Sequence, residues 1–195
     1  MIFKKRGFAI LIAVVVVCLS TVFSVHRFLG SACQKVADSF YSGVSNPAWG
    51  KNATLPSVND QLVGETRSRY TAANGLYAML SGNAALSNTD TAAQLRAAKE
   101  NLRSAATISD KFQANETLGK AFSAATNALR AQTLSDRDLQ MLTSYENDFK
   151  NAQNIIDTQS GYNDAVRTFY RNTLDVFPTN LLTWIVANKV PVLFA

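Results

Sequence analysis

The chain of 195 residues is long enough for one domain plus an appendage, and it carries a formal net charge of +5. The excess lies at one end, because five basic and no acidic residues precede Val36, whereas the rest holds 14 of each sign. A body without net charge excludes binding of nucleic acid through a basic surface. The only histidine, His26, lies beside the apolar N-terminal segment, which excludes Ser-His and Cys-His catalytic pairs from the body.

An uncharged apolar segment runs from residue 7 to residue 25. As a helix its 19 residues reach about 28 Å, close to the hydrocarbon core of a bilayer at roughly 30 Å. Three basic residues precede it, so the positive-inside rule places the N-terminus in the cytosol and the body outside. We expect a transmembrane anchor formed by Gly7, Phe8, Ile10, Leu11, Val14, Val17, Leu19, Val22 and Val25.

Two other interpretations of this N-terminal segment stay open. The small residues 30–32 have the spacing of a signal-cleavage site, and Cys33 is a possible lipid acceptor, although the apolar run is long and Gly30 replaces the expected large residue. Cleavage there would yield a secreted or lipid-anchored extracytoplasmic protein. Residues 5–8 also resemble a type IV pilin leader, but Ile12 replaces the glutamate of that pattern.

The rest of the chain is predicted to be helical. Prolines occur only at positions 47, 56, 178 and 191, so residues 57–177 lack this helix breaker. We expect an all-α fold, in which the transmembrane helix precedes an antiparallel long-helix bundle. The chain is divided into a cytoplasmic stub with the anchor (1–29), a juxtamembrane helix and loop (30–56), and a bundle with an apolar C-terminal tail (57–195).

Capping residues and apolar spacing predict the helices of the bundle. The first is expected to run from Ser57 to Gly82-Asn83 as one helix, the next to open at residues 88–90, and the longest to start at Ser135. A further helix is expected before Ser135, and an apolar stripe continues after Gly161. In chain order, the five predicted apolar faces consist of Val58, Leu62, Tyr70, Ala73, Leu76, Leu80; Leu95, Ala98, Leu102, Ala105; Leu118, Phe122, Ala125, Leu129; Leu139, Leu142, Phe149, Ala152, Ile156; and Tyr162, Val166, Phe169, Leu174, Phe177.

The C-terminal tail, residues 178–195, is too apolar for a solvated segment and too short to span a membrane. We expect it to fold back over the end of the bundle and close the core. Alternatively it lies in the membrane interface through Trp184, or inserts into a groove of a partner. The candidate interaction residues are Trp184, Ile185, Val192 and Phe194.

Three segments resemble a known family. Residues 162–166 (YNDAV) followed by 177–181 (FPTNL) are similar to the Tyr-Asn-x-x-Val … Phe-Pro-x-Asn pattern that ends LemA proteins, and residues 111–116 (KFQANE) resemble the Leu-Lys-Ala-Asn-Glu segment of that family. Residues 31–63 lack the family's basic stretch and its Asp-Leu-Ile-Pro-Asn-Leu pattern. The resemblance implies a distant, bacterial, LemA-like membrane protein of undefined role, and it transfers no active site.

The positions that match the family suit structural roles. The apolar ones lie on the predicted buried stripe, and the asparagines suit hydrogen bonds to helix ends. The matching residues are Ala114, Asn115, Glu116, Tyr162, Asn163, Val166, Phe177, Pro178 and Asn180.

These features together predict a single-pass protein that is not an enzyme. We expect a protein-interaction or scaffold module on the outer side of the bacterial cytoplasmic membrane. Its expected partners are the lipid bilayer and another protein or a second copy. No cofactor, metal, nucleic acid or small-molecule substrate is indicated, since the sequence has no Gly-rich phosphate loop and no Glu-x-x-His pair.

Overall fold

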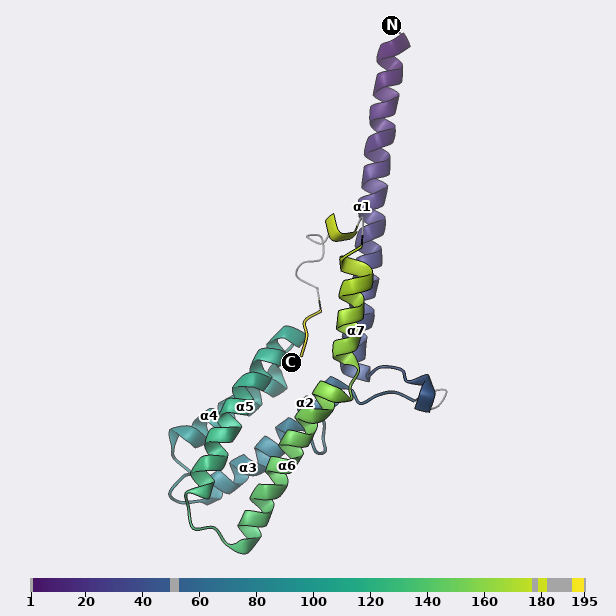
Figure 1. Ribbon diagram of the computed structural model, residues 1–195. Coiled ribbons are helices and arrows are strands. Elements are labelled where there is room, and N and C mark those ends of the chain that lie inside the picture. Colours follow the sequence, from purple (N-terminus) through teal and green to yellow (C-terminus); the bar gives the residue numbers. More distant parts are fainter. Residues whose placement is uncertain (1, 50–52, 177–178, 182–190, 195) are drawn as a thin grey trace.

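The computed structural model describes residues 2–49, 53–176, 179–181 and 191–194. Over these ranges the fold is all-helical, with the long apolar helix α1 (Ile2–Ser42) extending away from a helical bundle (Figure 1). The bundle contains α2 (Val58–Val63), α3 (Arg69–Gly82), α4 (Asp90–Ser104), α5 (Ile108–Arg130), α6 (Asp136–Thr158) and α7 (Tyr162–Phe169). Single turns follow at η2 (Tyr170–Leu174), which is π-helical, and at η3 (Thr179–Leu181), and η1 (Pro47–Trp49) precedes the bundle.

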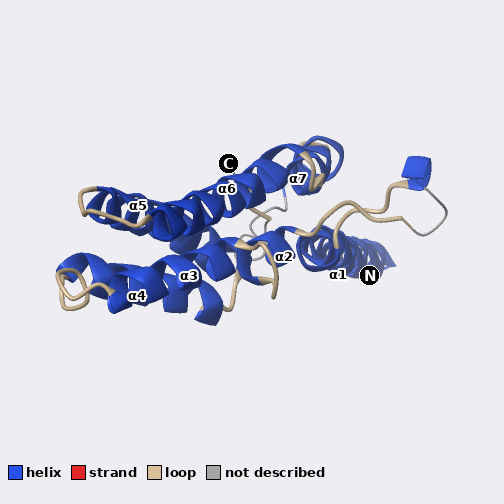
Figure 2. Cartoon of the chain, turned by 90° about the horizontal axis from the view of Figure 1, so that it is seen from below, coloured by secondary structure: helices blue, strands red, loops and turns tan. Residues whose placement is uncertain are grey.

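The helices form two layers. Figure 2 shows α4, α3, α2 and α1 following one another in one layer, and α5, α6 and α7 in the other. Across the layers α4 packs on α5, α3 on α6, and α1 on α7. Two layers with one core between them are the usual way to bury one apolar face of each helix.

The helix α1 is a single unbroken helix in which the expected anchor and the expected juxtamembrane helix are continuous. Its first part is exposed, whereas Leu29, Cys33, Val36 and Phe40 are buried at spacings of three and four residues. It ends before Gly43, whose φ of +77° is the left-handed conformation that glycine adopts without strain. The segment expected to be separate from the bundle therefore contributes one whole stripe of its core.

The expected helix from Ser57 to Gly82 is two helices, which corrects the prediction. α2 ends at Val63, with Gly64 as its C-cap, and α3 begins only after Ser68, whose hydroxyl accepts a hydrogen bond from the Thr71 amide at 3.1 Å. Between them Arg67 has a φ of +48°. Glycine favours the helix poorly, and the hydroxyl of Ser68 bonds the Gly64 carbonyl oxygen at 2.7 Å, so the backbone turns here.

The other predicted helix starts are confirmed. Ser57, Thr89 and Ser135 each cap a helix by accepting a hydrogen bond from a backbone amide three residues on. The helix that starts at Asp136 is no longer than α5, because both have 23 residues. Leu139, expected on its buried face, is 44% exposed in the first turn, at the end of the bundle.

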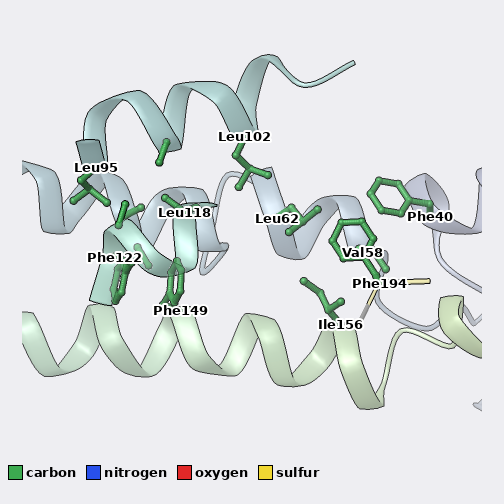
Figure 3. Packing of buried hydrophobic residues seen from close by; sticks show 14 of the residues in the cluster. Phe40, Val58, Leu62, Leu95, Leu102, Leu118, Phe122, Phe149, Ile156 and Phe194 are labelled. Carbon is green, nitrogen blue, oxygen red and sulfur yellow. The ribbon is translucent and has the colours of Figure 1, made fainter. Parts of the chain in front are cut away.

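One hydrophobic core runs the length of the two layers. Figure 3 shows it continuing from Leu95 and Phe122 at one end to Phe40 and Phe194 at the other. At the crossing of α3 and α6, Gly75 lies under the ring of Tyr145, and a Cβ atom on Gly75 would lie 2.4 Å from the ring. The absence of a side chain at this position is therefore what lets the Tyr145 ring lie against α3.

Replacing Gly75 with alanine should lower the stability of the bundle. The added methyl group must displace the Tyr145 ring, and such overpacking costs about 1–3 kcal/mol. Gly82→Ala is the matched control, because a Cβ atom there meets nothing within 4 Å and alanine favours a helix by about 0.5–1 kcal/mol. Thermal unfolding of the full chain in detergent, followed by circular dichroism, should show a lower midpoint for Gly75→Ala and an equal or higher one for Gly82→Ala. Equal midpoints for the two variants would contradict the close contact between Gly75 and the Tyr145 ring.

Candidate functional site

The last described residues, 191–194, fold back onto the bundle beside α7. The ring of Phe194 is 1% exposed, and its centroid lies 5.4 Å from that of Phe40 on α1 and 5.3 Å from that of Phe112 on α5. Figure 3 shows Phe194 next to Phe40 at the end of the core. These four residues therefore join three helices of the fold.

Polar side chains of α7 and η2 bind the backbone of this segment. Asn163 accepts a hydrogen bond from the Phe194 amide at 2.8 Å and donates one from its own amide group to the Phe194 carbonyl oxygen. The hydroxyl of Tyr162 donates to the Val192 carbonyl oxygen at 2.9 Å. We call residues 191–194, together with Tyr162, Asn163 and Tyr170, the C-terminal clamp.

The clamp holds its segment as a protein holds a bound peptide. The side-chain amide of Asn163 pairs with both backbone groups of one residue, as a neighbouring strand does. Tyr170 adds a hydrogen bond to the Pro191 carbonyl oxygen at 3.1 Å. Burial raises the pKa of Tyr162 and that of Tyr170, so both hydroxyls keep the protons that they donate. The arrangement fixes residues 191–194 against α7 and η2.

The structure locates part of the predicted interaction set. Phe194 is in the core and Val192 is half-buried in the clamp, so the expected return of the tail over the bundle is found for residues 191–194. Phe194 is therefore not exposed to a partner. Trp184, Ile185, Phe177 and Pro178 lie outside the described residues.

Two of the family-motif asparagines, Asn115 and Asn163, bond differently from the expectation. Asn163 binds the chain end and not a helix end, whereas the side chain of Asn115 donates to Gln153 on α6 at 3.3 Å. Tyr162 and Val166 are buried, as expected. The remaining motif residues that the structure describes are Ala114, which packs partly buried against the core, the exposed Glu116, and Asn180, whose backbone amide donates to the Val176 carbonyl oxygen at 3.0 Å.

Removing the Phe194 ring should destabilise the whole bundle. Phe194→Ala leaves a cavity among the rings of Phe40, Phe112 and Tyr162, and such a truncation costs about 3–5 kcal/mol. The neighbouring Leu193 is 41% exposed, so Leu193→Ala should change stability by no more than about 0.5 kcal/mol. Unfolding midpoints of the two variants in detergent check the difference. A midpoint for Phe194→Ala equal to that of Leu193→Ala would show that the clamp contributes nothing to the fold.

A second polar cluster lies inside the bundle, around Arg69 of α3. The Gln153 side-chain oxygen accepts hydrogen bonds from Arg69 and Asn115, and its amide group donates to Asp157 at 2.7 Å. The Arg69 guanidinium carbon lies 3.8 Å from the centre of the Phe149 ring, a cation–π contact. The cluster joins α3, α5 and α6.

Burial dominates the electrostatics of Arg69. It lowers the pKa of the guanidinium to about 10, and the charge of Asp157 opposes that shift. Arg69 is therefore charged in the folded chain at every pH below about 10, and burying this charge lowers the free energy of unfolding by a constant amount there. This destabilisation decreases only as the pH rises above about 10. Across the physiological range the cluster is insensitive to pH, which suits a structural element.

Sequence reasoning missed this cluster. The apolar spacing places Tyr70 on the buried face of the helix, and it predicts that the neighbouring arginine is exposed to solvent. Its burial depends on Gln153, 84 residues away, and on the small Gly119, where a Cβ atom would lie 3.1 Å from the guanidinium. Among the described buried atoms, Arg69 Nε and Asn115 Oδ1 have no hydrogen-bond partner.

Removing the Gln153 side-chain oxygen, which Arg69 and Asn115 share as an acceptor, should lower the stability of the fold. Gln153→Leu leaves the buried guanidinium and the Asn115 amide without their acceptor, which we expect to lower the free energy of unfolding by about 2–3 kcal/mol. Replacing the charge as well, in Arg69→Met/Gln153→Leu, should restore part of that loss, because a paired buried ion can be exchanged for apolar groups at little cost.

Urea unfolding of both variants and of Gln140→Leu, an exposed glutamine on the same helix, measures the coupling. A double variant less stable than Gln153→Leu alone would rule out this account of the cluster.

An open groove of about 830 Å³ lies between α1 and α7. Small and apolar side chains, among them Ala32, Val36 and Ala165, line it, with Lys35 and Asp164 also on its walls. In the described part of the chain no three histidine, cysteine or acidic side chains approach closely enough to hold a metal ion. Hydroxyl and amide side chains, among them Ser39 and Asn172, also line the groove, so its walls are mixed in polarity.

Comparisons with protein-family models, with curated proteins and with solved structures found no match for this chain. The resemblance to LemA proteins stays a prediction.

Proposed function

We propose that the chain is a membrane-anchored scaffold or protein-interaction module, with its N-terminus in the cytosol and its helical body on the outer side of a bacterial cytoplasmic membrane. One helix of the described chain is long and apolar enough to cross a bilayer, and the body covers none of its most apolar window. The apolar side chains of residues 8–23 have no protein around them, and a bilayer removes them from water.

The proposal depends mainly on the continuity of α1. The helix passes from the exposed residues of the span directly into the buried stripe from Leu29 to Phe40. A flexible linker would let the body turn freely, whereas an unbroken helix holds it in one orientation. A body whose orientation is fixed relative to its anchor suits the presentation of one surface to a partner, which we take to be another protein or a second copy.

The same burial disfavours the secreted or lipid-anchored alternative. Cleavage just before Cys33 would remove Leu29, which is completely buried, and would cut α1 within its core stripe. The thiol on which lipidation depends also lies inside the core. An uncleaved anchor leaves all of these contacts intact.

The finer architecture that we propose is an antiparallel bundle of the LemA type. Short connections join α3 to α4 and α4 to α5, and in both cases the two consecutive helices pack on each other, which supports this arrangement. Tyr162 and Asn163, where the resemblance is strongest, both bind residues 191–194, which supports a structural use of that motif in this chain.

Cysteine labelling in intact bacterial cells tests the proposed topology. In a Cys18→Ala background, with Cys33 buried, a cysteine at position 139 should react with a membrane-impermeant maleimide added outside, because Leu139 is exposed at the far end of the body. A cysteine at position 3 should react only after the cells are permeabilised.

Both variants should run as full-length chains on gels, because the proposed anchor is not cleaved. Labelling of position 139 only after permeabilisation would reverse the topology. Loss of position 3 from the mature protein would instead support the cleaved alternative.

A further inference from the structure

The body reaches the level at which α1 leaves the proposed span. α7 begins beside Phe40, where the Tyr162 ring centroid lies 5.4 Å from that of Phe40. From there α7 and η2 run back along α1, and the groove between them is lined by Ala32 on one side and Thr173 on the other. Val25, the last residue of the span, is partly buried against the core cluster. No length of bare helix therefore separates the body from the membrane surface.

Exposed apolar side chains gather at this same level. In the described chain beyond the span, the two large apolar side chains with the greatest exposure are Phe28 on α1, at 58%, and Val176 after η2, at 48%. Val176 follows η2, whose Asn172 and Thr173 line the same groove as Ala32 of α1, so the return of the chain along α1 carries it toward the membrane end of the body. Two residues 148 positions apart in the sequence are therefore placed toward the same end of the body.

Two arginines accompany these apolar groups. Arg27 and Arg171 are both exposed, and each is close in sequence to one member of the apolar pair. A guanidinium binds phosphate well, and a long side chain can keep its charge among lipid headgroups while its stem lies against apolar groups. We call Arg27, Phe28, Arg171 and Val176 the membrane collar.

The height of Phe28 on α1 matches the headgroup layer. Phe28 lies three residues beyond Val25, a rise of about 4.5 Å at 1.5 Å per residue. The polar layer on each face of a bilayer is about 5–8 Å thick. In that layer an exposed phenylalanine and valine lose water contact, and arginines meet lipid phosphates.

We propose that the membrane collar is a lipid-binding surface, seated in the headgroup layer of the same bilayer that holds α1. The proposal rests on the anchoring proposed above and adds a second contact with lipid, from the end of η2. The body then lies against the membrane on one side of α1, held by a segment distant in sequence from the anchor.

Spin labels on the full chain in vesicles of phosphatidylglycerol and phosphatidylcholine test the proposal. In the Cys18→Ala background, nitroxides are attached at Val176→Cys, at Leu139→Cys as an equally exposed control far from the collar, and at Phe23→Cys within the span. Accessibility to oxygen, which concentrates in lipid, is compared with accessibility to a water-soluble nickel chelate. The circular dichroism of each variant is compared with that of the parent to verify the fold.

The label at position 176 should be accessible to oxygen and protected from nickel, as the label at position 23 is. The label at position 139 should be at least several-fold more accessible to nickel. If position 176 behaves as position 139 while position 23 lies in lipid, the anchor stands and the collar contact is disproved. If position 23 is itself accessible to nickel, the anchoring fails, and the collar proposal fails with it.

Discussion

The apolar stripe Leu29–Phe40 on α1 is the constraint on which the rest of the structure depends. It lies on the same helix as the exposed span, so the helix that would enter lipid also supplies one wall of the protein core. α7 and the clamped chain end cover this wall, and the aromatic rings of Phe40, Tyr162 and Phe194 meet there. Without that stripe the body would be an independent bundle, tied to the anchor only by the segment of chain that leads from α1 to α2.

The two polar clusters fix different parts of the helix arrangement. The clamp fixes the chain end against α7 through backbone hydrogen bonds, and the Arg69 cluster sets how α3, α5 and α6 meet in the middle of the bundle. Apolar packing alone tolerates sliding between helices, whereas a buried polar group must find its partner. Each cluster thus selects one relative position of its helices from many that would bury similar apolar area.

The features of the fold that could be predicted from the sequence are those with local signals. The helix starts at Ser57, Thr89 and Ser135 depend on a hydroxyl and the next three residues, so they are readable from the chain alone. The break before Ser68 was missed because the apolar spacing continues across it. The burial of Arg69 and the hydrogen bonds of Asn163 depend on partners 84 and 31 residues away, and no local pattern contains them.

The unbroken course of α1 has one further mechanical consequence. A membrane helix tilts when its apolar length and the thickness of the bilayer differ. Because α1 continues into the core without a hinge, the body must lean by the same angle as the span. In the proposed placement, a change of lipid thickness is therefore converted into a rotation of the whole bundle relative to the membrane plane, which makes its orientation a readout of the bilayer around it.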